Sequence, residues 1–269
     1  MKTKVIREIC VAGPVIEVII KSSMSNHKAK RKARTNVTSE LVQKNNDKIA
    51  VKKLTRLINA NFGRGCWHVV LTYEESVSPE AAQKELKKFI SRMRRSCRKQ
   101  GIEFRWIAVT EYENVRIHHH FITNAPLDLI ESQWKNGHAL PRPFDNRKNH
   151  DKLAAYLIKE TTKTFREEGS PCKSRYSHSR NLFIPEVRTE IVSEKQLNED
   201  PKPFKGYYID QDSIERYEHP VTGLPHLEYQ MISLTEEPRI KKYYKGKIKT
   251  REEDLRKYIN YIEEQMSLL

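Results

Sequence analysis

Three consecutive histidines, His118, His119 and His120, are the residues of this sequence best suited to bind a metal ion, and apolar residues flank them on both sides. The flanking residues are strand formers, and successive side chains in a β-strand point to opposite faces. His118 and His120 therefore share one face, whereas His119 points to the other. Two neutral imidazoles on one face can bind a single divalent ion. A pair of this kind also occurs in ordinary protein cores, so the chemistry requires a third ligand.

Glu111 is the obvious third ligand, because it ends the strand predicted over residues 104–111 and a short loop joins that strand to the histidines. The two strands should therefore be antiparallel neighbours. Two imidazoles, one carboxylate and open positions suit Mg²⁺, Mn²⁺ or Zn²⁺ by ligand type, and a phosphate oxygen could fill an open position. We expect Mg²⁺ or Mn²⁺, bound by Glu111, His118 and His120, to serve phosphoryl chemistry.

Tyr156 is the candidate nucleophile of the sequence. It lies in a predicted helix over residues 149–160, with Lys159 three residues later on the same face. A helical tyrosine standing alone is usually an edge residue of a core. A phenol with a pKa near 10 is a poor nucleophile at neutral pH, but a metal-polarised phosphate and a nearby ammonium would lower the barrier. Lys159 would stabilise the charge that develops on the phosphate.

The elements that must position these residues alternate between strands and helices. Strands are predicted over residues 67–73, 104–111, 116–123 and, at an edge, 137–144. Ser78, Pro79 and Glu80 begin a helix that runs to Lys99, and a short helix follows over residues 127–135. This order predicts an α+β fold with a central antiparallel sheet that bears the His-x-His strand.

Segments outside this region extend it at both ends. We expect a hairpin over residues 4–11 and 14–20, a helix from Thr38 or Ser39 to about residue 61, strands over residues 185–192 and 207–209, and a helix over residues 250–269. Residues 21–34 are basic and could be a solvated linker or an arm that orders on DNA. The expected domains are residues 1–63 (hairpin, linker and helix), 64–165 (catalytic domain) and 166–269 (C-terminal extension).

The charge balance points to a polyanionic partner. The 269 residues contain 50 Lys and Arg against 35 Asp and Glu, which gives a formal charge of +15 and a pI near 9.6. Nucleic acid is the leading partner, with an anionic membrane surface as the competitor. The longest apolar run falls far below the roughly 20 residues that span a membrane, and the N-terminal segment lacks the features of a signal peptide. A cytoplasmic location is expected, and the four isolated cysteines suggest neither a zinc ribbon nor a redox pair.

The helix over residues 78–99 carries a strongly basic face that could contact DNA phosphates. For any one of these residues, a solvated helix face is the simpler interpretation. As a group they are a candidate electrostatic footprint, and Arg116 beside the histidines is a further candidate. The predicted DNA-binding residues are Arg92, Arg95, Lys99 and Arg116.

Three motifs together resemble those of the HUH endonucleases. They are Val109-Thr110-Glu111-Tyr112, Arg116-Ile117-His118-His119-His120-Phe121 and Ala155-Tyr156-Leu157-Ile158-Lys159, in this order and spacing. Trp67 to Tyr73, which ends in Leu-Thr-Tyr, is similar to a further motif that precedes them, and Ser179-Arg180-Asn181-Leu182 with Pro185 is similar to a segment downstream of the tyrosine helix in bacterial members. The resemblance is closest to rolling-circle replication initiators of small phages and plasmids.

The resemblance implies a ferredoxin-like or RRM-like palm whose helices lie on one face of the sheet. It implies that Glu111, His118 and His120 hold one divalent ion, that Tyr156 attacks the scissile phosphate of single-stranded DNA, and that Lys159 assists. The products would be a free 3′-hydroxyl and a 5′-phosphotyrosine link. Glu160 occupies the position where some phage initiators carry a second tyrosine, so the resemblance implies a single-tyrosine enzyme.

The implied partner is single-stranded DNA at a replication origin, for which an inverted repeat is one form. The sequence contains no Walker-type phosphate-binding motif, so a host helicase and polymerase are expected partners. A relaxase or a single-strand transposase would use the same chemistry, because motifs report the reaction and not its biological role. A DNA-binding protein without catalytic activity is the alternative from a different class.

Overall fold

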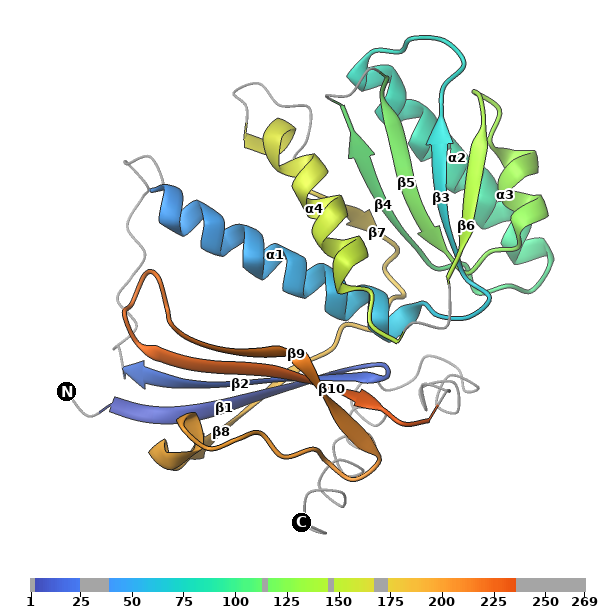
Figure 1. Ribbon diagram of the computed structural model, residues 1–269. Helices are drawn as coiled ribbons and strands as arrows, with labels where there is room; N and C mark the ends of the chain where they lie inside the picture. Colours follow the sequence, from blue (N-terminus) through green and yellow to red (C-terminus); the bar gives the residue numbers. More distant parts are fainter. Residues whose placement is uncertain (1–2, 25–38, 113–115, 145–147, 167–173, 236–269) are drawn as a thin grey trace. The chain divides into compact units, whose positions relative to one another are not determined.

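The computed structural model describes residues 3–24, 39–112, 116–144, 148–166 and 174–235 (Figure 1). The chain divides into two compact units: Asp47–Phe183 form one, which we call the palm, and Met1–Asn46 with Ile184–Leu269 form the other, which we call the outer unit. Among the described helices, none is long and apolar enough to cross a membrane. The palm contains all of the predicted site residues.

The outer unit is a five-stranded antiparallel sheet in the order β8-β1-β2-β10-β9. The predicted N-terminal hairpin is present, and its two strands lie in the middle of the sheet with C-terminal strands on both sides (Figure 1). The segments expected as an N-terminal and a C-terminal extension are therefore joined in one sheet. The strands are β1 (Thr3–Ala12), β2 (Val15–Met24), β8 (Val187–Val192), β9 (Tyr207–Glu218) and β10 (Pro225–Ser233), with a short 3-10 helix η1 (Glu194–Leu197).

The palm is built on a second five-stranded antiparallel sheet, in the order β6-β3-β5-β4-β7. Its strands are β3 (Trp67–Thr72), β4 (Trp106–Glu111), β5 (His118–Thr123), β6 (Ala139–Pro143) and β7 (Ser177–His178). With α2 between β3 and β4, and α3 between β5 and β6, the first four strands follow the β-α-β-β-α-β order of a ferredoxin-like fold. The predicted α+β palm is confirmed.

Helices cover both faces of the palm sheet. Helices α2 (Pro79–Lys99) and α3 (Leu127–Gln133) pack on the face that includes Phe121 and Leu71. The other face is covered by α4 (Asp151–Arg166) and by the C-terminal half of α1 (Glu40–Asn61), in a core that includes Val109 and Ile122. Helices were expected on one face only; α4 and α1 are additional to the α2 and α3 layer.

Local sequence features explain where the helices that matter for the site begin. The Ser78 hydroxyl caps α2 by accepting a hydrogen bond from Ala81 N at 3.2 Å, as expected for a serine before an N1 proline. The start of α4 is fixed to α1 because the Asn59 side chain accepts from His150 N and donates to the Asn149 side chain, both at 3.0 Å. These two bonds set the position of the helix that carries Tyr156.

Several sequence predictions fall outside the described residues. They include most of the basic linker, at residues 25–38, and the C-terminal helix over residues 250–269. Among the described elements, β7 and β10 were missed, and the strand predicted over residues 207–209 extends to Glu218 as β9.

Candidate metal centre and nucleophile

The central strand β5 brings two histidines and one glutamate to the same face of the palm sheet. Its register against β4 places His118 opposite Glu111 and His120 opposite Val109. Directly opposed residues of antiparallel strands point to the same face. Because Val109 belongs to the core beneath α4, the three candidate ligands lie on the α4 side of the sheet.

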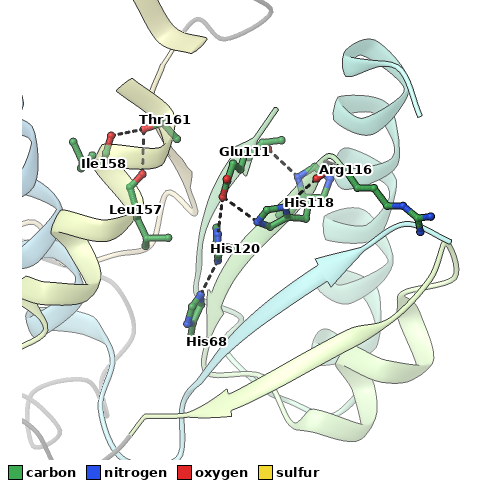
Figure 2. Close-up of polar contacts among 10 residues, drawn as sticks. His68, Glu111, Arg116, His118, His120, Leu157, Ile158 and Thr161 are labelled. Atoms are coloured by element: carbon green, nitrogen blue, oxygen red, sulfur yellow. Dashed lines mark hydrogen bonds and ion pairs between the residues drawn. The ribbon is translucent and has the colours of Figure 1, made fainter. Parts of the chain in front are cut away.

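The side chains of Glu111, His118 and His120 converge on one point (Figure 2). Glu111 Oε2 lies 3.0 Å from His118 Nε2 and 3.5 Å from His120 Nε2. One ligand atom from each residue falls within 4.8 Å of the other two. Glu111 and His120 are almost fully buried, whereas the side chain of His118 is 17% exposed. The group is therefore anchored in the sheet and open to solvent on the His118 side.

Hydrogen bonds at the far side of each imidazole ring hold the two Nε2 atoms toward Glu111. His118 Nδ1 lies 3.1 Å from the Arg116 carbonyl oxygen, so this nitrogen carries the proton and donates it. His120 Nδ1 lies 3.1 Å from Nε2 of a third histidine, His68, on β3. The Nε2 atom of His120 is buried and makes no hydrogen bond within the described residues. A ligand nitrogen with a fixed ring and an unused lone pair fits a cation site.

Burial and charge set the protonation of the group. Burial raises the pKa of Glu111, the charge of His118 lowers it, and the nearby carboxylate of Glu160 raises it again. Burial, followed by the charges of neighbouring histidines and of Arg142, lowers the pKa of His120 to about 3. The imidazole of His120 is therefore neutral at physiological pH, which is the form that binds metals. Two imidazoles and one carboxylate can hold a divalent cation, and they do not by themselves select one metal.

His119 lies on the opposite face of the sheet, as the strand alternation predicts. Its ring is fully buried; Nε2 lies 2.8 Å from the Tyr73 hydroxyl and Nδ1 lies 2.8 Å from the Thr110 hydroxyl. The ring also packs edge-on against Trp134. Both ring nitrogens are thus engaged within the α2 and α3 layer, and His119 faces away from the three candidate ligands.

Tyr156 lies beside the metal group on α4. Its ring packs edge-on against His120, with 5.4 Å between the ring centroids, and 44% of the residue is exposed. The flanking Leu157 and Ile158 are buried, and their carbonyl oxygens accept hydrogen bonds from the Thr161 hydroxyl (Figure 2). These buried neighbours anchor α4 and leave the Tyr156 phenol accessible next to the candidate ligands.

The charges near Tyr156 oppose one another. Burial raises the pKa of its phenol, the carboxylates of Glu111 and Glu160 raise it further, and the guanidinium of Arg142 lowers it. The phenol is therefore protonated at neutral pH. Lys159, the second helical residue predicted to take part, is exposed on α4.

Three residues near the site were missed from the sequence: His68, Arg142 and Glu160. His68 on β3 is paired with Arg142 on β6, and both face the α4 side of the sheet because His68 is hydrogen-bonded to His120. Burial, followed by the charge of Arg142, lowers the pKa of His68 to about 4. Glu160 follows Tyr156 by one helical turn, a spacing that could have identified it as a neighbour of the site.

The predicted DNA-binding residues fall in two places. Arg95 and Lys99 are exposed on α2, which lies across the sheet from the metal group. Arg92, on the same helix, donates from Nε and Nη2 to the Gln133 carbonyl oxygen at 3.1 and 3.0 Å, so its guanidinium ties α2 to the end of α3. Arg116 is exposed next to His118, with its side chain extending away from the metal group (Figure 2).

Comparison with known protein families gives one match. Residues 66–165 match the family described as replication-associated protein ORF2. No curated protein and no solved structure matches the chain. The matched segment begins just before β3 and ends within α4, so it covers the strands that carry the metal group and the helix that carries Tyr156. The resemblance to replication initiators is confirmed for this segment.

Proposed function

We propose that this protein is a rolling-circle replication initiator that nicks and rejoins single-stranded DNA through Tyr156 and a divalent ion, Mg²⁺ or Mn²⁺. The proposed ligands of the ion are Glu111, His118 and His120. The match of residues 66–165 to replication-associated proteins supports the role in replication and the DNA partner. The observation that carries the chemistry is the convergence of three ligand atoms within 4.8 Å beside an accessible phenol.

In the proposed step, the Tyr156 oxygen attacks the phosphorus of a phosphodiester in single-stranded DNA. The new oxygen–phosphorus bond replaces the bond from phosphorus to the 3′ oxygen of the preceding nucleotide, and the phenol proton ends on that 3′ oxygen. The products are a 5′-phosphotyrosine and a free 3′-hydroxyl. Attack by a 3′-hydroxyl on the phosphotyrosine reverses the step and joins two ends, with no external energy source because the bond is conserved.

The residues around Tyr156 have distinct proposed tasks. A divalent cation bound at the metal group would supply positive charge to a phosphate oxygen. The phenol must lose a proton that burial and two carboxylates hold in place, so cationic side chains near it favour the step. Lys159, three residues away on α4, is the proposed partner for the charge that develops on the phosphate. Arg142 is a second cation whose charge acts on the phenol.

The proposed path of the DNA strand starts at the exposed side of the metal group. Arg116, adjacent to His118, is the proposed contact nearest to the reacting phosphate. Arg95 and Lys99 lie on the far side of the sheet, so a strand that contacts them as well has to pass around a sheet edge. A host helicase and polymerase are the proposed partners for unwinding and synthesis.

A covalent adduct is the direct test of this proposal. The full chain is incubated with Mn²⁺ and single strands prepared from the gene and its flanking DNA, and products are separated on a denaturing gel. Wild-type protein should form an adduct that resists denaturation and is removed by protease. Tyr156→Phe should form none, because the phenyl ring keeps the packing against His120 but lacks the attacking oxygen.

Matched variants separate the site from general effects. Tyr208→Phe makes the same change at a tyrosine of the outer unit that is 47% exposed, close to the 44% of Tyr156, and should leave the adduct unchanged. His120→Ala should abolish the adduct while salt-sensitive DNA binding persists. The nicking assignment fails if Tyr156→Phe forms as much adduct as wild type, or if wild type binds these strands without any adduct; the second result favours the non-catalytic DNA-binding alternative.

A further inference from the structure

His68 is buried directly behind one of the candidate ligands. Its Nε2 atom lies 3.1 Å from Nδ1 of His120, and the two residues are 8% and 3% exposed (Figure 2). The ring centroids are 5.3 Å apart, with 30° between the ring planes. His68 belongs to β3, where its backbone pairs with Ile122, so it reaches His120 diagonally across the strands. The sheet register holds both rings, and a change at His68 acts on His120 first.

The arrangement of donors and acceptors fixes the direction of this hydrogen bond. A neutral imidazole has one protonated nitrogen, and the other carries the lone pair that can bind a cation. His120 Nε2 faces Glu111 Oε2, so it can serve as a ligand only when the proton is on Nδ1. His120 Nδ1 must then donate, and His68 Nε2 must accept. In His118 the same task falls to a main-chain carbonyl, that of Arg116.

We propose that His68 is a positioning residue for the metal centre: its Nε2 accepts the Nδ1 proton of His120 and thereby holds the His120 lone pair at the ion. This inference rests on the proposed function only in the use of the ion for strand transfer, since it concerns metal binding itself. Outer partners of ligating histidines typically change metal affinity by 10–100-fold when they are removed. Loss of the acceptor at position 68 should therefore weaken metal binding without removing any ligand.

The test compares variants that differ in the acceptor, with Mn²⁺ alone as the probe. His68→Gln places an amide oxygen where it can accept from His120, whereas His68→Leu fills similar space with no acceptor. Isothermal titration of the full chain with Mn²⁺ should show binding weakened about 10–100-fold in His68→Leu, and His68→Gln should bind severalfold more tightly than His68→Leu. A purely structural role would weaken both variants alike. Equal binding in His68→Leu and wild type, or equal loss in both variants, overturns the proposal.

Two further measurements keep the test decisive. Nitrogen NMR of histidine-labelled wild type without metal should show the Nδ1 atom of His120 protonated and the Nε2 atom bare; the opposite assignment overturns the proposal even if His68→Leu does not fold. Adduct formation against Mn²⁺ concentration should shift to higher Mn²⁺ in His68→Leu and approach the wild-type level at saturation. If no adduct forms in wild type but Mn²⁺ binding follows the predicted order, the nicking function fails and the role of His68 stands.

Discussion

His119 makes the acid stability of the palm testable. It is fully buried, and burial, followed by the charge of His118, lowers its pKa from 6.5 to about 3. Unfolding exposes the ring to water and restores its ordinary pKa. Between pH 6.5 and pH 3 the unfolded state therefore binds a proton that the folded state does not. The resulting stability is complete above pH 6.5 and is lost as the pH falls toward 3.

The magnitude follows from the size of this shift. A difference of about 3.5 pKa units corresponds to roughly 5 kcal/mol over the whole range, at about 1.4 kcal/mol for each unit. Between pH 6 and pH 4 the share of His119 is about 2.5 kcal/mol. His119→Gln removes this share because glutamine does not titrate. At pH 7 the substitution should itself cost about 1–3 kcal/mol, since the hydroxyls of Tyr73 and Thr110 lose their present partner.

The assay is urea unfolding at pH 6, 5 and 4 in the presence of EDTA, followed by tryptophan fluorescence. The three tryptophans of the chain, Trp67, Trp106 and Trp134, all belong to the palm, so the signal reports this unit. The free energy of unfolding should fall by about 2.5 kcal/mol less in His119→Gln than in wild type between pH 6 and pH 4.

The control is His138→Gln, which makes the same substitution at an exposed histidine of the palm and should preserve the wild-type dependence on pH. Parallel curves for wild type and His119→Gln would refute the reasoning. They would mean either that the ring is protonated in the folded state or that it is not buried in solution.

Other predictions follow from residues around the site. Leu157→Ala, which leaves a cavity beneath α4, should destabilise the palm by about 2–5 kcal/mol in urea unfolding; a loss below 1 kcal/mol would contradict the burial of Leu157. Arg142→Gln removes a charge that lowers the pKa of Tyr156, so the profile of adduct formation should move to higher pH, and an unmoved profile would exclude this influence. Charge reversal of Arg95 and Lys99 should weaken single-stranded DNA binding and flatten its dependence on salt; an unchanged salt slope would assign this face of α2 to solvent.

The parts of the site that the sequence predicted follow from local periodicity. A strand has a side-chain period of two, which separated His119 from His118 and His120 before any partner strand was known. Glu111 followed from the short loop that makes β4 and β5 neighbours. Tyr156 was identified by its helix and motif, and its position against His120 depends on the packing of α4, which the sequence pattern did not specify.

The residues that were missed depend on strand register over long separations. His68 meets His120 across 52 positions in sequence, and no local pattern marks it. Arg142 reaches the same face only through the pairing of β6 with β3. The outer unit was divided in two for the same reason, since nothing local links β1 with β8. By contrast, β10 could have been found, because its apolar residues alternate with polar ones as in any half-buried strand.

The central place of the hairpin in the outer sheet has a consequence for synthesis. Strands β1 and β2 leave the ribosome first, but their lateral partners β8 and β10 are encoded after the palm, and Val187 follows Met24 by 163 positions. At about 5–20 residues per second, the wait is roughly 8–30 s. Throughout this interval an apolar hairpin exposes two unpaired edges, which are templates for pairing with another nascent chain. We expect a chain that ends before β8 to aggregate through this hairpin, even when its palm has already folded.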